Sequence, residues 1–359
     1  MAVTLPIIPH SKPTLSDDDV RALTAVVQSG HLSLGPHVEE FERDMAAFVG
    51  VSGAVAVSSG TAALELALRA LGVGPGDEVI LPSYVCAAPW LATVRVGAGP
   101  RVVDIDLTTY AIDPALAGKL LSARTKAIIV PHPFGLPADL TKLQTLGVPL
   151  IEDCAQTLGA TESGRPVGSV GVMAICSFYA TKLFCAGEGG MVLSRDPALL
   201  EKCRALRDYD EAPTLDAAAY NYKMTDMQAA LGVSQLARFR SFLDRRATIA
   251  AAYQAALART GLVLPMIPEG RTHIFYRYVV RVHHADRARH SLDQILGRLE
   301  HRGVQCRRPV FRALHRYLNL EDCPESEEAS ETALSVPIYP SMTDEDVTRT
   351  IRTLCEELT

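Results

Sequence analysis

The sequence has no dense cluster of lysine and arginine. Its 359 residues include 35 lysines and arginines and 41 aspartates and glutamates, which gives a net charge of −6. DNA and RNA binding depend on a basic surface, so this composition disfavours a nucleic-acid partner. A small anionic ligand remains compatible with it, because local hydrogen-bond donors bind a phosphate whatever the overall charge.

Paired cysteine motifs are also absent. None of the eight cysteines forms a C-x-x-C pair, and no group of histidines and cysteines has the spacing of a zinc site. Most of the cysteines stand in apolar runs, where a free thiol behaves as a small hydrophobic side chain. We therefore expect reduced thiols in a reducing compartment, and no metal site.

The sequence shows neither a signal peptide nor a membrane span. Residues 1–13 lack a charged start followed by an apolar stretch, and no apolar run approaches the roughly 18 residues that cross a bilayer. We expect a soluble cytoplasmic protein without a membrane partner. With 48% hydrophobic residues, the chain can bury the core of one large domain and a smaller one.

Short apolar runs alternate with helical patterns over the first half of the chain. This alternation predicts an α/β fold, in which a mostly parallel seven-stranded sheet lies between helices. A helical pattern over about 15–50 precedes the sheet. The strands are predicted at 54–57, 78–81, 102–105, 127–130, 150–151, 174–178 and 190–194.

The character of the sequence changes near residue 247. The pattern before this point predicts one long helix over 224–246. We predict a large domain over 1–246, which includes the N-terminal helical segment, and a smaller α+β domain over 247–359. The smaller domain is predicted to contain a helix through 257, a strand-like segment at 273–282, and helices at 291–302 and 344–358.

One lysine follows an apolar strand and precedes a glycine turn. The run SFYATK ends at Lys182 and is followed by GEGG, and the upstream run IEDCAQ contains Asp153 and Gln156. Pyridoxal phosphate (PLP) chemistry needs a lysine amine that forms a Schiff base with the aldehyde. It also needs a carboxylate that keeps the pyridine nitrogen protonated. The amide could reach the phenolic oxygen of the ring. An aspartate at a strand end is also consistent with a simple helix cap.

The run SSGT stands between a predicted strand and a predicted helix. It places Gly60 and Thr61 at a helix N-terminus, where backbone N–H groups and a hydroxyl can bind a phosphate. Ser177, five residues before Lys182, could add another donor. The same pattern is common at capped helices that bind nothing, so it supports a PLP site only together with the other motifs.

In this order, the motifs resemble the DegT/DnrJ/EryC1/StrS group of sugar aminotransferases. This group belongs to the aspartate-aminotransferase superfamily, fold type I of the PLP enzymes. The resemblance runs from about Lys12 to the C-terminus, and it includes LGP followed by EEFE near the start. The other matching segments are SSGTAAL, DEVILPSY, IEDCAQ, SFYATK, GEGG, YNYKMTDMQAAL and YPSMTDED.

The resemblance implies a role for each matching residue. Lys182 would form the internal aldimine and then move a proton between the α-carbon of the donor and the cofactor. Asp153 would pair with the pyridine nitrogen, and Gln156 would contact the phenolic oxygen.

The resemblance also implies how the phosphate is bound. It would lie against Gly60, Thr61 and Ser177. Asn221 matches a family asparagine that reaches the phosphate of the neighbouring subunit. The active sites would then lie at the interface of an obligatory homodimer.

The sequence departs from the family pattern at the cofactor ring. Cys86 stands where the family commonly stacks an aromatic side chain on PLP. Tyr84 or Trp90 could compensate, although both are also consistent with core packing. A thiol in this position would cover the ring less completely.

The substrate region departs from the pattern as well. The run RRPVFRALH, which ends at His315, occupies the place of a family substrate loop that is usually richer in histidine and tyrosine. Its arginines could meet a phosphate or a carboxylate, or be solvated. Tyr179, three residues before Lys182, could face the substrate or pack. His315 and Tyr179 are therefore candidate substrate contacts.

The resemblance implies a ping-pong transamination from L-glutamate to a keto-sugar, most simply a nucleotide-linked one. A keto-cyclitol or a free keto-sugar acid is an alternative acceptor. Related sugar dehydratases replace the lysine, typically with histidine, whereas this chain has Lys182. A non-catalytic protein on the same fold would be expected to lose Lys182 or Asp153. An aldolase or a desulfurase is a further alternative, but Cys185 lies too close to Lys182 to serve as a mobile desulfurase cysteine.

Overall fold

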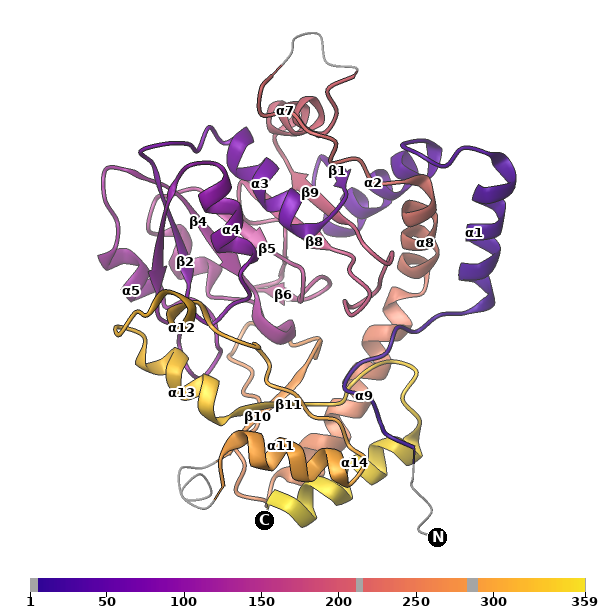
Figure 1. Ribbon diagram of the computed structural model, residues 1–359, viewed down its shortest axis with the longest axis vertical. Helices are drawn as coiled ribbons and strands as arrows, with labels where there is room; N and C mark the ends of the chain where they lie inside the picture. The colour runs from indigo at the N-terminus through magenta and orange to yellow at the C-terminus, as the bar shows by residue number, and fades with distance from the viewer. Residues whose placement is uncertain (1–5, 211–215, 283–289, 359) are drawn as a thin grey trace.

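A seven-stranded sheet forms the centre of the larger part of the molecule (Figure 1). The computed structural model describes residues 6–210, 216–282 and 290–358. The strand order is β1-β9-β8-β5-β4-β2-β3, and β9 alone runs antiparallel to its neighbours. The prediction of a mostly parallel seven-stranded sheet is confirmed. The strands are β1 (Gly53–Val57), β2 (Glu78–Pro82), β3 (Gly99–Val103), β4 (Thr125–Pro131), β5 (Leu150–Asp153), β8 (Met173–Ser177) and β9 (Gly190–Ser194).

Helices cover both faces of this sheet, because its strands are apolar on both sides. In β2, Val79 and Leu81 point to one helical layer, and Ile80 points to the other. The first layer consists of α3 (Gly60–Ala70), α4 (Ala88–Arg95) and α7 (Pro197–Arg207). The second layer consists of α2 (Pro36–Val49), α5 (Pro114–Lys119), α6 (Leu140–Gln144) and α8 (Asp226–Ala237).

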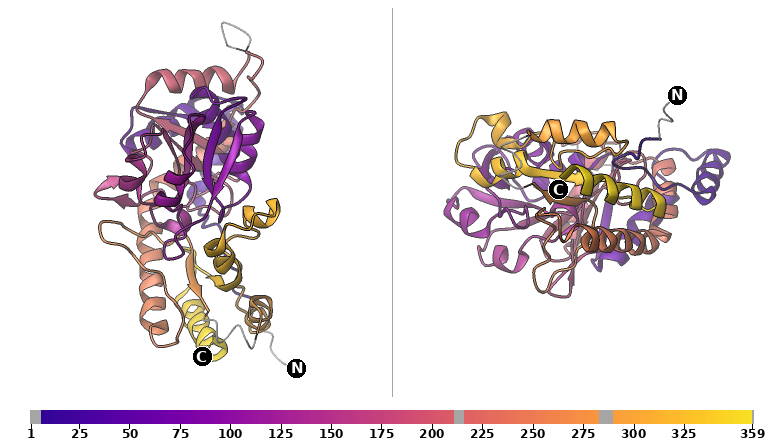
Figure 2. Two further views of the ribbon diagram at one scale, coloured as in Figure 1. Left: turned by 90° about the vertical axis from the view of Figure 1, so that its left-hand side faces the viewer. Right: turned by 90° about the horizontal axis from the view of Figure 1, so that it is seen from below.

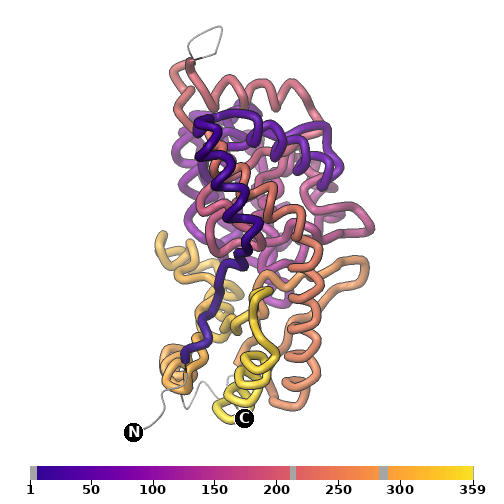
Figure 3. The backbone as a smooth tube through the Cα atoms, turned by 90° about the vertical axis from the view of Figure 1, so that its right-hand side faces the viewer, coloured from indigo at the N-terminus to yellow at the C-terminus, as the bar shows by residue number. Residues whose placement is uncertain are grey.

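A smaller α+β unit lies at one end of the molecule (Figure 2). Its core includes Ile8, which forms a bridge to Val304, so the N-terminal segment packs with the C-terminal part of the chain. This segment then runs back to α1 (Asp17–Ser29), which packs beside α8 (Figure 3). The elements of the unit are α9 (Phe239–Leu257), β10 (Tyr278–Arg281), α11 (Leu292–His301), β11 (Ala333–Val336) and α14 (Asp344–Leu358).

The prediction of one helix over 224–246 is wrong. The chain forms α8 and α9 instead, with a break at Arg238, whose φ of −102° and ψ of 0° leave the helical region. The guanidinium of Arg238 pairs with Asp19 of α1 over 2.6 Å, a tertiary contact that no local pattern encodes. Helix α9 continues to Leu257, so the proposed domain boundary at residue 246 falls within this helix.

The predicted strand-like segment at 273–282 is also shorter than expected. Only β10 is a strand, and the residues before it form an irregular connection that reaches the site described below. None of the helices within the described ranges combines the length and the apolar character that a bilayer crossing requires.

Candidate active site

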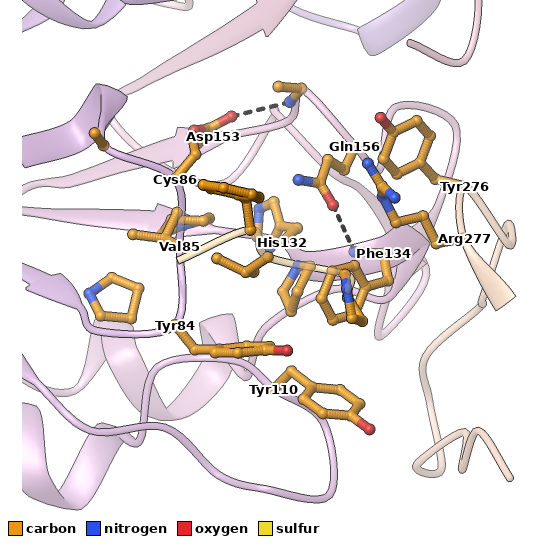
Figure 4. Close-up of a pocket in the computed structure, with 18 of the residues that line it drawn as sticks. Tyr84, Val85, Cys86, Tyr110, His132, Phe134, Asp153, Gln156, Tyr276 and Arg277 are labelled. Carbon is orange, nitrogen blue, oxygen red and sulfur yellow. Dashed lines mark hydrogen bonds between the residues drawn. The ribbon is translucent and has the colours of Figure 1, made fainter. Parts of the chain in front are cut away.

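A pocket of about 310 Å³ opens at the carboxyl ends of β2, β4, β5 and β8 (Figure 4). This edge of a parallel sheet is where ligands bind in open α/β folds. Five of the residues that we predicted from the sequence line this pocket: Cys86, Asp153, Gln156, Tyr179 and Lys182.

Asp153 ends β5 and points its carboxylate into the pocket. Its Oδ1 accepts a hydrogen bond from the backbone N–H of Ala155 over 3.0 Å. Burial raises the pKa of the Asp153 carboxyl, and the positive charge of Lys182 only partly opposes this effect. A cationic N–H group in the pocket would therefore be a favourable partner for Asp153.

Gln156 is oriented by the backbone of Phe134. The N–H of Phe134 donates to Gln156 Oε1 over 2.9 Å, which leaves the side-chain NH₂ group as a donor for a ligand. Phe134 has a φ of 59°, in the left-handed region that a bulky residue rarely adopts. Such strained backbone is typical of functional sites, where the surrounding contacts hold it in place.

Lys182 lies beyond β8, in a turn closed by the hydrogen bond from its own N–H to Tyr179 O over 2.8 Å. Its Nζ lies 5.7 Å from the centroid of the buried Tyr276 ring. Burial alone would raise the pKa of the Tyr276 phenol. The charges of Lys182 and Arg277, helped by a hydrogen bond with Thr181, outweigh burial and lower that pKa below its usual value.

The predicted phosphate-binding residues meet where β1, β8 and β9 come together. Ser177 and Val57 both pair with Gly190, the first residue of β9. A Cβ on Gly60 would lie 2.8 Å from Ser177 Cβ, so only glycine allows this close approach. The amides of Gly60 and Thr61 precede the first intrahelical bonds of α3, which leaves them available to an anion.

The position where we predicted ring stacking is held by a cysteine at the pocket wall. Cys86 lines the pocket and is solvent-exposed. Tyr84 is buried at the pocket wall and stacks against Tyr110, with ring centroids 5.9 Å apart. Trp90 packs against the core between the sheet and α3. The core-packing interpretation of Trp90 therefore holds, whereas Tyr84 both packs and lines the pocket.

The remaining predicted residues have different positions. Tyr179 is 46% exposed at the pocket. Asn221 is exposed in the loop before α8, and its Oδ1 accepts a hydrogen bond from Lys223 N over 3.3 Å. His315 lies outside the pocket, buried between Ser83 and Glu327, and its predicted contact with substrate stays a prediction.

His132 was not singled out from the sequence, although it follows the end of β4 at the same edge of the sheet. Its Nδ1 accepts a hydrogen bond from Ala138 N over 3.0 Å, so its Nε2 carries the proton that Glu152 accepts over 3.1 Å. Glu152 is fully buried and also accepts three backbone N–H groups, from Gly168, Val170 and Gly171.

This network explains a cluster with the composition of a metal site. The ligand atoms of His132, Glu152 and Cys154 lie within 4.8 Å of one another. The imidazole Nδ1 and both carboxylate oxygens already accept hydrogen bonds from protein groups. Burial opposes ionisation of Glu152, but its hydrogen bonds, the one from His132 foremost, lower its pKa.

Tyr276 and Arg277 were also missed. Both line the pocket, and they come from the irregular segment before β10, which looked like a strand in the sequence. Among the described residues of the pocket wall, Asp153 is the only carboxylate, whereas three side chains are cationic. These are Lys182, Arg277 and Arg312. The pocket is therefore suited to anionic ligands.

Comparison with known proteins agrees with this geometry. The model of the DegT/DnrJ/EryC1/StrS aminotransferase family matches residues 13–355. The spore coat polysaccharide biosynthesis protein SpsC of Bacillus subtilis is 34% identical over 368 aligned residues, which cover 95% of this chain and 94% of SpsC. GDP-perosamine synthase of Caulobacter vibrioides is 35% identical over 341 aligned residues, which cover 91% of each chain.

A solved structure shows the same fold. Spr1654 of Streptococcus pneumoniae, in its PLP form, superposes with a TM-score of 0.91 at 27% identity, covering 98% of this chain and 100% of that chain. The likeness extends over both the large sheet and the smaller α+β unit. The predicted fold type I architecture is confirmed.

Proposed function

Because this chain belongs to the DegT/DnrJ/EryC1/StrS aminotransferase family, we propose that it transfers an amino group from L-glutamate to a nucleotide-linked keto-sugar. Enzymes of this family are PLP-dependent sugar aminotransferases. The observation that carries the finer proposal is the convergence of Lys182, Asp153 and Gln156 on one pocket. The name of GDP-perosamine synthase supports a nucleotide-linked acceptor.

The residues present fit PLP at three separate points. Asp153 is a buried carboxylate with a raised pKa, which a pyridinium N–H would stabilise. Gln156 offers an NH₂ group whose orientation Phe134 fixes. Gly60 has no room for a Cβ beside Ser177, as expected where a backbone turn binds a phosphate closely.

Each side chain has a task in this proposal. When bound, PLP supplies an electron sink that makes the α-proton of an amino acid acidic. The Lys182 amine would hold the cofactor through its aldehyde carbon, and Lys182 Nζ would then accept the α-proton of the donor and pass it on to the cofactor. Asp153 would keep the pyridine nitrogen protonated, and the NH₂ group of Gln156 would donate to the phenolic oxygen. Gly60, Thr61 and Ser177 would bind the phosphate, and Cys86 would face the ring.

Absorption spectroscopy tests this proposal. The purified protein loaded with PLP should show a visible band that L-glutamate bleaches. Lys182→Ala should lack both the band and the bleaching, whereas Lys142→Ala, at an exposed lysine of α6, should behave as the wild type. A wild-type protein without any band would contradict the proposal. A band that glutamate leaves unchanged would rule out this donor.

A screen of acceptors should follow the half-reaction. The bleached enzyme should recover its band when a nucleotide-linked keto-sugar is added. Recovery with a keto-cyclitol or a free keto-sugar acid, but with no nucleotide-linked sugar, would favour the alternative acceptors.

A homodimer with shared active sites is part of the same proposal. Asn221 is exposed and outside the pocket, which suits a residue that acts on a neighbouring subunit. Helix α1 also presents exposed apolar side chains, Val20 and Val27, beside its contact with α8. Light scattering should give the mass of two chains.

Complementation then tests the shared site. Lys182→Ala and Asn221→Ala should each be impaired alone. A mixed dimer of the two should regain activity, because one of its sites combines the intact Lys182 of one chain with the intact Asn221 of the other. No recovery after denaturation and joint refolding would mean that both residues act within one subunit.

A further inference from the structure

Arg277 lines the pocket with a positive charge that no carboxylate of the described residues neutralises. Its Nη1 donates to His10 Nε2 over 3.2 Å, and its Nε is buried without a partner. Arg207 and Arg238 also have an unpaired Nε, but each pairs with a carboxylate over 2.6 Å. A cation left unpaired in a partly buried pocket implies an anionic ligand.

His10 orients Arg277 but does not cancel its charge. Burial, followed by the charges of Arg277 and Arg307, lowers the pKa of His10 to about 3, so its ring is neutral. An arginine can only donate, so His10 Nε2 is the acceptor of this bond. Ser335 Oγ lies 2.8 Å from the same nitrogen and donates to it as well. The guanidinium is therefore fixed in place with its full charge.

The backbone of Phe134 connects Arg277 to the cofactor end of the pocket. The N–H of Arg277 donates to Phe134 O over 3.1 Å, and the N–H of Phe134 donates to Gln156 Oε1 over 2.9 Å. Figure 4 shows Arg277, Tyr276 and Gln156 on the same side of the pocket. The strained Phe134 thus ties the position of Arg277 to that of Gln156.

Arg277 and the proposed catalytic lysine both lie against the ring of Tyr276. The Arg277 Cζ lies 5.3 Å from the centroid of Tyr276, and Lys182 Nζ lies 5.7 Å from the same centroid. The two charged groups are thus at most about 11 Å apart, and an anion bound by Arg277 would share the pocket with Lys182. Tyr276 itself responds to both charges, as the lowering of its pKa indicates.

We propose that Arg277 binds the carboxylate attached to the reacting carbon of the amino donor. This inference rests on the proposed aminotransferase function. In an α-amino acid the carboxylate is bonded directly to the carbon that loses its proton to Lys182. In a nucleotide sugar, the sugar ring separates the diphosphate from the keto carbon, which places that anion farther away. The planar fork of arginine matches a carboxylate with two parallel hydrogen bonds.

Single-turnover kinetics of Arg277→Gln test the assignment. The PLP-loaded enzyme is mixed with L-glutamate and, separately, with L-alanine, which has only the α-carboxylate. The donor concentration at half-maximal rate should rise on the order of 10- to 100-fold for both donors, since bonds to a charged group are lost. Arg277→Lys should recover part of this loss. Arg352→Gln, at an exposed arginine of α14, removes the same charge and should change neither value.

Two results would overturn the inference while leaving the proposed function intact. One is an Arg277→Gln variant whose half-reaction equals that of the wild type. A variant that is impaired with glutamate but not with alanine would count equally against the inference. The other is an equal rise in the KM for the sugar acceptor, which would assign Arg277 to an anion of the acceptor. A wild type that bleaches with no L-amino acid would instead refute the proposed function and this inference together.

Calorimetry provides a readout that needs no turnover. The cofactor-free protein is titrated with 2-oxoglutarate, which carries the same α-carboxylate as the donor. Arg277→Gln should weaken this binding at least tenfold relative to the wild type, and Arg352→Gln should not. Equal affinities of the wild type and both variants for 2-oxoglutarate would contradict the role of Arg277. If none of the three proteins binds 2-oxoglutarate, equal half-reaction rates of the three would contradict it as well.

Discussion

The side chain of Gln156 takes its orientation from Phe134, whose backbone N–H donates to Gln156 Oε1 over 2.9 Å. The bond makes the amide oxygen an acceptor and turns the NH₂ group to the pocket. A glutamate at position 156 could accept the same bond but could not donate. Substitutions at position 156 can therefore test two functions separately: accepting the bond from Phe134, and donating to a ligand.

Gln156→Glu should fold normally and bind PLP more weakly by an order of magnitude or more. The substituted carboxylate still accepts from Phe134, but it would place a negative charge beside the anionic phenolic oxygen. A spectroscopic titration with PLP measures the affinity. Gln156→Met serves as the control, because it removes the donor without adding a charge. It should weaken binding less than the glutamate does, and the reverse order would contradict this account.

Asp153→Asn should make the cofactor-free protein more stable at pH 7 while impairing PLP function. Burial raises the pKa of Asp153 above its unfolded value of 3.8, so ionisation costs stability. The stabilising contribution is complete below that unfolded value and is lost as the pH rises through the folded pKa. The gain from asparagine should therefore be larger at pH 7 than at pH 4, as thermal unfolding without PLP would show.

The same variant should lose the half-reaction with glutamate by on the order of 100-fold or more, because the pyridine nitrogen loses its counter-charge. A variant that is less stable than the wild type at pH 7, but not at pH 4, would contradict the effect of burial. A variant with an unchanged half-reaction would contradict the pairing of Asp153 with the cofactor.

Gly190→Ala should damage the phosphate turn through a direct clash. An added Cβ would lie 2.2 Å from Ser59 O and 2.6 Å from Gly60 N, both of them backbone atoms that cannot swing aside. We expect a loss of roughly 2–4 kcal/mol in the free energy of unfolding. Urea denaturation without PLP measures this loss, and the affinity for PLP should fall as well.

Gly297→Ala is the matched control. Gly297 lies within α11 and has nothing within 4 Å of the added Cβ. Alanine there should stabilise the protein by about 0.5–1 kcal/mol, since glycine is unfavourable inside a helix. If both substitutions stabilise the protein, β9 does not pack against the phosphate turn as closely as the structure indicates.

The pocket residues that could be predicted from the sequence are those that follow the carboxyl ends of strands. Parallel strands bring their carboxyl ends to one edge, so residues that follow apolar runs, such as Asp153 and Lys182, converge whatever the details of packing. Arg277 escaped prediction for a physical reason. It enters the pocket from an irregular segment more than 90 residues after Lys182. Arg277 stands out because no carboxylate of the described residues pairs with it, and only the contacts in the folded structure show this.

The same distinction holds for the fold. The seven strands could be predicted because short runs of β-branched residues are typical of buried parallel strands. The break at Arg238 has no local sequence signal, and the partner of Arg238 is Asp19 of α1, more than 200 residues earlier. The side chain of His315 likewise contacts Ser83, which is distant in the sequence, and Glu327, which belongs to a different helix. The sequence pattern around His315 indicates neither contact.

His315→Gln should impair acceptor binding rather than the chemistry of the donor. His315 Nδ1 lies 2.6 Å from Ser83 Oγ, and its Nε2 lies 2.8 Å from Glu327 Oε2. Ser83 begins the segment that ends at the pocket residue Cys86. On the other side, His315 follows Phe311 at the pocket mouth, so it joins the two segments.

Loss of this link should raise the KM for the sugar acceptor about three- to tenfold, because the loop around Phe311 is no longer fixed. The half-reaction with glutamate should keep its rate, which separates positioning from general damage. Glu327→Gln should have a smaller effect, since its amide oxygen can still accept from His315 Nε2. A fall in the glutamate half-reaction equal to the loss with acceptor would show that His315 supports the whole site.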